Sequence, residues 1–244
     1  MVRGSHGSLE RYLEVTRRPS VAIVFVVPLV LVHALAVARA ERFVQVGAER
    51  LVDHVMRVGP VGERVLQVVL ALIVSAAVIH VVRERIPVHR HFPAFLVECL
   101  LLACLLGPVV SIVTNTSLFH VRAPAVSLRS VWPFVIGAIG AGIYEEIVFR
   151  LLLLSSVALS LRRGLRFSAP GSAALAVFVS AGAFAWAHFV GAGGEAFAWR
   201  PFAFRLAAGL LLGAVFVLRG LGVAVYLHAA YDALFAWRVA VSSE

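Results

Sequence analysis

The stretch VWPFVIGAIGAGIYEEIVFRLLLLSSVALSL, residues 131–161, decides the fold. It is almost wholly apolar and longer than the roughly 20 residues that a helix needs to cross a bilayer. As one straight helix it would measure about 46 Å, against a hydrocarbon core of about 30 Å. The segment must therefore tilt, protrude or break. Gly137, Gly140 and Gly142 are the expected weak points or close helix contacts.

Six further apolar segments of membrane length accompany this stretch, at approximately 21–39, 65–83, 92–113, 171–191, 202–218 and 221–237. Lipid offers no hydrogen-bond partners to the backbone, so each segment is predicted to be helical. The alternation over about ten residues that marks the strands of a membrane barrel is missing. The sequence thus predicts an all-α fold, a polytopic transmembrane helix bundle of about seven spans, with a range of about six to eight.

The composition also indicates that lipid is the solvent. Hydrophobic residues make up 61% of the chain and charged residues 14%, whereas soluble domains have about 45–50% and about 25%. The formal net charge is +9, and all 22 basic residues are arginine. These arginines lie between apolar runs rather than in one patch. Attraction to anionic lipid explains them better than nucleic-acid binding does.

The chain is expected to form one membrane domain with two parts. Residues 1–130 would supply about three spans and an interfacial amphipathic helix over 42–58. Residues 131–240 would form a four-helix core. The first apolar run follows basic residues and resembles a signal peptide, but it exceeds the usual 7–15-residue signal core. A retained first span is therefore the preferred interpretation.

Ionisable residues inside spans are costly and point to function. The first group is Glu145, Glu146 and Arg150. Glu146 and Arg150 are four residues apart, so they share a helix face and can pair. Glu145 lies about 100° away around the helix and is left to face another helix. The alternative interpretation is a buried ion-pair cluster that only fixes helix packing.

Two further groups lie near the ends of later segments. His188 can hold a water, accept a proton or bind a metal, or it can simply bond to a neighbouring carbonyl. His228 and Asp232 share a helix face because they are four residues apart. Asp232 could orient His228, the two could together polarise a carbonyl, or they could only satisfy each other. Since hydrolysis needs an activated water and an oxyanion cradle, the three groups complement one another.

In this order, Glu145-Glu146-x-x-x-Arg150, Phe184-x-x-x-His188 and His228-x-x-x-Asp232 resemble the three motifs of the CPBP family. That family comprises CAAX prenyl endopeptidases of the Rce1 type and bacteriocin-processing proteins, and is also called ABI. The resemblance covers roughly residues 131–240 and implies an intramembrane glutamic endopeptidase.

The resemblance also implies roles for individual residues. Water activation would fall to Glu145 and His188, and oxyanion stabilisation to His228 and Asp232. The supporting residues would be Glu146, Arg150 and Phe184. Asp232 departs from the family pattern, in which asparagine is common. An ionised aspartate cannot donate a hydrogen bond, so Asp232 is either protonated or orients His228.

No cofactor is required by this implied mechanism. A zinc version would use Glu145, His188 and His228 as ligands and leave one position open. The compact two-histidine helix motif of zincins is absent from the sequence, so the metal-free mechanism is favoured.

The implied partners are the lipid bilayer and a membrane-anchored protein or peptide, with no nucleic acid. Cleavage would fall near a membrane-embedded or lipidated C-terminal segment, as in C-a-a-X proteins, bacterial leaders or C-terminal sorting tails. The alternative is a non-proteolytic bacteriocin-immunity or scaffold protein. The expected location is the membrane as a multi-pass protein, the inner membrane if the source is bacterial.

Other polar residues have simpler expectations. Glu98 is expected to pair with Arg150 or to face an aqueous cavity, and His33 to be a packing or interfacial residue. Cys99 and Cys104 should face different sides of a helix. Three tryptophans fit interfacial belts or cavity walls: Trp186, Trp199 and Trp237.

Overall fold

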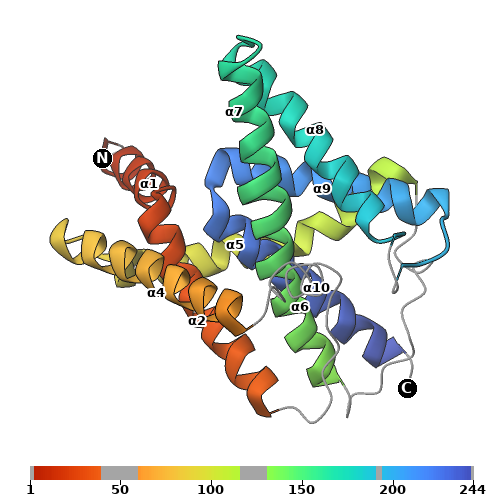
Figure 1. Ribbon diagram of the computed structural model, residues 1–244, viewed down its shortest axis with the longest axis horizontal. Coiled ribbons are helices and arrows are strands. Elements are labelled where there is room, and N and C mark those ends of the chain that lie inside the picture. Colours follow the sequence, from red (N-terminus) through yellow and green to blue (C-terminus); the bar gives the residue numbers. More distant parts are fainter. Residues whose placement is uncertain (1–2, 40–59, 116–130, 191–193, 243–244) are drawn as a thin grey trace.

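The computed structural model describes residues 3–39, 60–115, 131–190 and 194–242, and in these ranges all regular structure is helical (Figure 1). The N-terminal part contains α1 (Arg3–Thr16), α2 (Pro19–Arg39), α4 (Pro60–Arg83) and α5 (Val88–Thr114). The C-terminal part contains α6 (Val131–Glu145), the π-helix η3 (Glu146–Leu154), α7 (Ser155–Arg163), α8 (Ala169–Ala187), α9 (Trp199–Arg219) and α10 (Leu221–Ser242). The all-α prediction is confirmed for the described residues.

Each predicted apolar segment is helical, but fewer than seven helices qualify as membrane spans. Among the described residues, four helices are long and apolar enough to cross a membrane, namely α2, α5, α8 and α9. α4 contributes a shorter apolar helix at Val68–Arg83. The 131–161 segment contains the π-helix, and α10 is continuous but carries the polar residues His228, Asp232 and Arg238. The number of about seven spans is therefore not confirmed, and the predicted interfacial helix over 42–58 lies outside the described residues.

The long 131–161 segment does not break at its glycines. Its irregularity is the π-helix, which begins at Glu146 and runs to Leu154. At its end the Ser155 N–H bonds to the carbonyl of Arg150, five residues earlier. Such wide turns are rare and frequently occur at functional sites. Here the irregular turn coincides with the paired carboxylates.

The glycines instead allow helices to approach closely. A Cβ atom on Gly142 would lie 2.7 Å from the Cβ of Ala229 and 2.8 Å from the carbonyl oxygen of Val225, both on α10. A Cβ on Gly140 would lie 2.7 Å from Cε1 of His33. His33 itself is buried, as a packing histidine would be. Small residues thus let α6 meet α10 and α2, one of the two roles expected for these glycines.

A substitution pair tests this close contact. Gly142→Ala should lower the free energy of unfolding by about 1–3 kcal/mol, because the added methyl overpacks the α6–α10 contact. Gly182→Ala is the matched control, since a Cβ there meets nothing within 4 Å. It should leave stability unchanged or raise it by up to about 1 kcal/mol through helix propensity. Chemical unfolding in detergent measures both changes, and equal destabilisation by the two variants would contradict the packing account.

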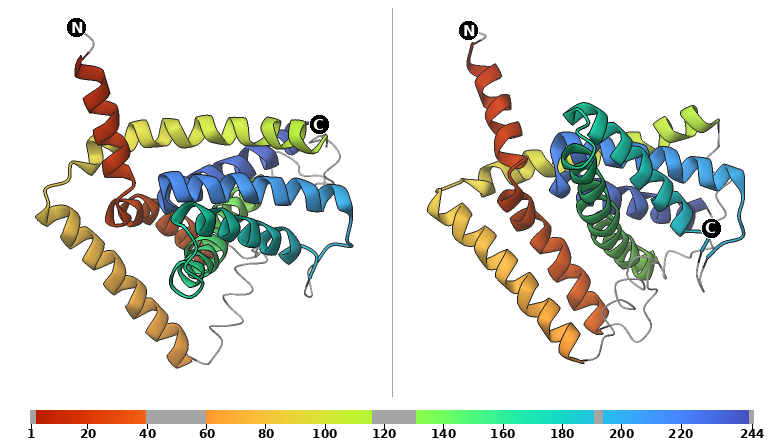
Figure 2. Two further views of the ribbon diagram at one scale, coloured as in Figure 1. Left: turned by 90° about the horizontal axis from the view of Figure 1, so that it is seen from above. Right: turned by 45° about the horizontal axis from the view of Figure 1, so that its top comes forward.

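α10 lies at the centre of the packing. It contacts α6, α5, α2 and α9, and in Figure 2 α5 and α9 run beside each other across the molecule. The Tyr226 ring packs edge-on against Phe95 with centroids 5.2 Å apart, and its hydroxyl donates to the Phe25 carbonyl over 2.8 Å. The next residue of α10, Leu227, packs with Leu106 and Leu212. These contacts fix the rotation of α10 and hence the direction of its polar residues.

α9 and α10 are joined through a single residue, Gly220. Gly220 has φ 87° and ψ 178°, a conformation that other residues rarely adopt. The two cysteines are free, with Cys99 buried and Cys104 exposed, so they do face different sides of α5.

The prediction that Glu98 pairs with Arg150 is wrong. Glu98 instead binds Arg219 at the end of α9. Nε of Arg219 lies 2.6 Å from Oε1 of Glu98, and its Nη2 lies 2.8 Å from Oε2. Glu98 also accepts a hydrogen bond from the Tyr12 hydroxyl of α1. Burial and the neighbouring Glu98 carboxylate raise the pKa of Tyr12. The physical reason is position, because the face of α5 that carries Glu98 meets α1 and the end of α9.

Arg219 links α1 to the rest of the helix bundle, since its Nη2 atom also donates to Thr16 Oγ1 over 2.9 Å. Arg219→Met should therefore speed amide hydrogen exchange across Arg3–Thr16 by about ten-fold, as charged hydrogen bonds contribute about 1.5–3 kcal/mol. Arg18→Met is the control, because Arg18 pairs with the exposed Glu14 within the same part of the chain. If both variants leave hydrogen exchange in α1 unchanged, the contact of Arg219 with α1 does not stabilise that helix.

Candidate active site

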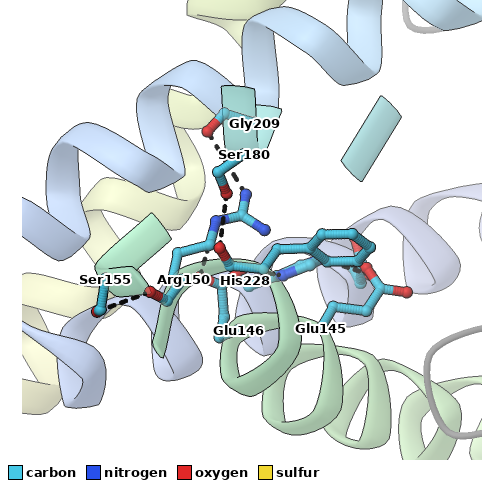
Figure 3. Close-up of polar contacts among 9 residues, drawn as sticks. Glu145, Glu146, Arg150, Ser155, Ser180, Gly209 and His228 are labelled. Carbon is cyan, nitrogen blue, oxygen red and sulfur yellow. Dashed lines mark hydrogen bonds and ion pairs between the residues drawn. The ribbon is translucent and has the colours of Figure 1, made fainter. Parts of the chain in front are cut away.

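Two adjacent carboxylates face one histidine at the junction of α6, η3 and α10 (Figure 3). The Nδ1 atom of His228 lies 2.8 Å from Oε1 of Glu146, and its Nε2 atom lies 3.8 Å from Oε2 of Glu145. Glu146 is fully buried, while Glu145 and His228 are nearly so. The short bond identifies Nδ1–H as the donor to Glu146, because a carboxylate can only accept. His228 thus turns Nε2 toward Glu145.

The expected pairing of Glu146 with Arg150 is present. Arg150 Nε lies 3.3 Å from Glu146 Oε2, and both side chains are 0% exposed. The guanidinium also covers the ring of Phe184 at 4.6 Å from its centroid and donates to the Gly209 carbonyl over 3.5 Å. Arg150 therefore holds η3 against α8 and α9. Through Glu146 it also determines where the imidazole of His228 lies.

Asp232 lies one turn beyond His228 on α10. Its Oδ2 atom is 3.5 Å from Nε2 of His228, and its side chain is 34% exposed. Asp232 therefore lies at the open edge of the cluster, whereas Glu146 and Arg150 close its inner side. The contact shows that the two side chains share a face of α10, and the orienting role of Asp232 stays a prediction.

His188 approaches the cluster from the C-terminal end of α8. Its Nδ1 atom bonds to the Phe184 carbonyl over 2.9 Å. In neutral His188, Nδ1 is then the donor and Nε2 the acceptor. The Phe184 ring lies between the two histidines, with centroids 5.1 Å from His188 and 5.9 Å from His228.

The predicted site residues therefore do not all contact one another. Glu145, Glu146, Arg150, His228 and Asp232 form one connected set. Among the described residues, Glu145 makes its polar contact with His228, and His188 joins the set through Phe184 rather than through a bond to Glu145.

Ser180 was not among the predicted site residues. This buried residue of α8 donates its hydroxyl to the Phe149 carbonyl over 2.7 Å, inside the π-helix. A second hydroxyl, from Ser155, donates to the Arg150 carbonyl over 3.2 Å. Ser180 lies four residues before Phe184 and eight before His188, a spacing that places all three on one face of a helix. That spacing was the signal that could have identified it.

Within the described residues, no three His, Cys, Asp or Glu side chains are placed to hold a metal ion together. His228 Nδ1 is bonded to Glu146 and His188 Nδ1 to Phe184. The zinc set Glu145, His188 and His228 stays a prediction, to be tested with a chelator.

The described part of the chain is thus all-helical, with apolar helices of membrane length and a buried carboxylate–histidine site. Residues 127–234, a little under half of the chain, match the family model for type II CAAX prenyl endopeptidase Rce1-like proteins. This segment contains every residue of the site, and its match supports the resemblance to the Rce1-like family that the three ordered motifs indicated. No curated protein and no solved structure matches the chain.

Proposed function

We propose that this protein is an intramembrane endopeptidase that uses a glutamate-activated water. The observation that carries the proposal is the buried contact between Glu145 of α6 and His228 of α10, with the imidazole held by Glu146. A helix bundle that only needed stability would not require three carboxylates around one histidine, since buried charges are costly. The Rce1-like match of the same segment supports a protease.

In the proposed reaction, Glu145 and His188 prepare the attacking water. Both offer acceptor atoms, a carboxylate oxygen on Glu145 and Nε2 on neutral His188. A proton leaves the water for one of these acceptors as the oxygen bonds to the scissile carbonyl carbon. The same proton then passes to the departing amine nitrogen as the C–N bond breaks.

His228 is proposed to stabilise the oxyanion. A protonated imidazole donates from both nitrogens, so Nδ1–H can keep its bond to Glu146 while Nε2–H points to the developing charge. Asp232 Oδ2 lies 3.5 Å from the same Nε2, so its carboxylate would stabilise the positive charge of the protonated imidazole. Under this proposal His228 alone donates to the oxyanion, and Asp232 need not donate where asparagine is common in the family.

The proposed substrate is a membrane-anchored protein or peptide cut near a membrane-embedded or lipidated C-terminal segment. The family match supports a C-a-a-X-type segment. We further propose that the enzyme is a multi-pass membrane protein, in the inner membrane if bacterial, with 1–130 as membrane scaffold and 131–240 as catalytic core.

The test is cleavage by the purified full-length chain in proteoliposomes. The peptide panel contains the same membrane-anchored sequence with a prenylated, an acylated and an unmodified C-terminus. Each peptide is assayed with and without a strong chelator. The proposal predicts cleavage that survives chelation and is lost in His188→Ala. Cleavage abolished by the chelator and restored by zinc would replace the glutamate mechanism with the metal one. Binding of a peptide by folded protein without any cleavage would favour the immunity or scaffold alternative.

A further inference from the structure

Three of the four exposed tryptophans lie toward one end of the molecule, beside the candidate site, whereas the fourth, Trp132, lies at the start of α6. Trp186 lies in the last turn of α8, Trp199 begins α9 and Trp237 lies near the end of α10. Their exposed fractions are 53%, 73% and 54%. The end of α8, the start of α9 and the end of α10 lie on the same side in all three views of Figures 1 and 2.

Aromatic contacts join two of these tryptophans into one surface. The Phe197 ring lies 5.9 Å from Trp186 and 5.1 Å from Trp199, measured between centroids, and is itself exposed. Arg205 holds the connection between α8 and α9 in place. It binds Glu195 over 2.7 Å and covers the Phe189 ring at 5.2 Å from its centroid. We define the tryptophan face as Trp186, Phe197, Trp199 and Trp237.

The position of this face indicates that its partner is the lipid bilayer. α8 ends and α9 begins here, and both are candidate membrane spans. A tryptophan ring combines a large apolar surface with one N–H donor, so it prefers the headgroup level of a bilayer to either water or hydrocarbon. Arg200, which is also exposed and next to Trp199, suits the phosphate groups at the same level.

We propose that the tryptophan face lies in the phospholipid headgroup layer of one leaflet, and that the open edge of the site lies at that depth. His188 comes two residues after Trp186. Asp232 comes five residues before Trp237, about 7.5 Å along the helix. The catalytic part rests on the proposed function, and the lipid contact does not. Cleavage would then occur where an anchored chain leaves the bilayer.

Single-tryptophan proteins test the placement. Each keeps Trp186, Trp199 or Trp237 and carries Trp→Phe at the other three positions, Trp132 included. The proteins are reconstituted in vesicles whose lipids are brominated near the headgroup end or near the methyl end of the acyl chains. We expect all three fluorescence signals to be quenched at least two-fold more strongly by the shallow label. The unmodified protein, measured in parallel, should show the same order.

Two results would overturn the proposal. One is stronger quenching by the deep label, which would place the face in hydrocarbon. The other is quenching by aqueous iodide without quenching by either lipid, which would place it in water. Neither depends on activity. Shallow quenching in a protein that cleaves nothing would therefore refute the proposed function and leave the placement intact.

Discussion

Glu145→Gln should slow single-turnover peptide cleavage by about 100- to 10,000-fold, the contribution that a positioned general base typically makes. Glutamine keeps the size and the hydrogen-bonding oxygen of the side chain but cannot take up the proton of the water. The substituted side chain should still fit beside His228, 3.8 Å away in the native protein. The measurement is the rate constant for cleavage of a membrane-anchored peptide with enzyme in excess.

The control is Glu14→Gln, which removes an exposed carboxylate on α1 whose partner is Arg18. Its cleavage rate should equal that of the native protein. The role assigned to Glu145 would be wrong if Glu145→Gln, with an unchanged unfolding midpoint, cleaved at the native rate.

Arg150→Met should lower the free energy of unfolding by about 3–5 kcal/mol, the usual loss when one partner of a buried ion pair is removed. Arg150 and Glu146 are both fully buried and 3.3 Å apart. Without the guanidinium, Glu146 loses its arginine partner while the other carboxylates of the cluster stay nearby, and the contacts of Arg150 with Phe184 and Gly209 are lost as well. Chemical unfolding in detergent, followed by circular dichroism, measures the change.

Arg162→Met provides the comparison, because Arg162 is exposed at the end of α7. This variant should stay within about 0.5 kcal/mol of the native protein. If the two arginine substitutions had equal effects, the buried network would not be what holds η3 against α8 and α9.

Much of this architecture could be predicted from residue patterns alone. Lipid permits only helices or closed barrels, so apolar runs such as 92–113 had to be helical. The pairing of Glu146 with Arg150 followed from their spacing of four residues. The face shared by His228 and Asp232 followed in the same way, and their atoms do lie 3.5 Å apart.

Contacts between distant segments could not be predicted in this way. Glu98 and Arg219 are separated by 121 residues, and nothing in the period of either helix selects one partner over another. The π-helix was also missed, because glycines mark flexible backbone whereas this irregularity depends on tertiary hydrogen bonds such as that from Ser180 to the Phe149 carbonyl. The same limit explains why Glu145 was paired with His188 on chemistry alone, while its contact in the structure is His228.

The central claim is that the α6 carboxylate and the α10 histidine act as one catalytic unit, and a double-mutant cycle tests it most directly. Single-turnover cleavage rates are measured for native protein, Glu145→Gln, His228→Gln and the double variant, each shown to be folded. Residues that act together on one step give strongly non-additive losses. We predict that the double variant cleaves within a few-fold of the slower single variant. Losses that multiply, or a single variant that retains native activity, would contradict the claim.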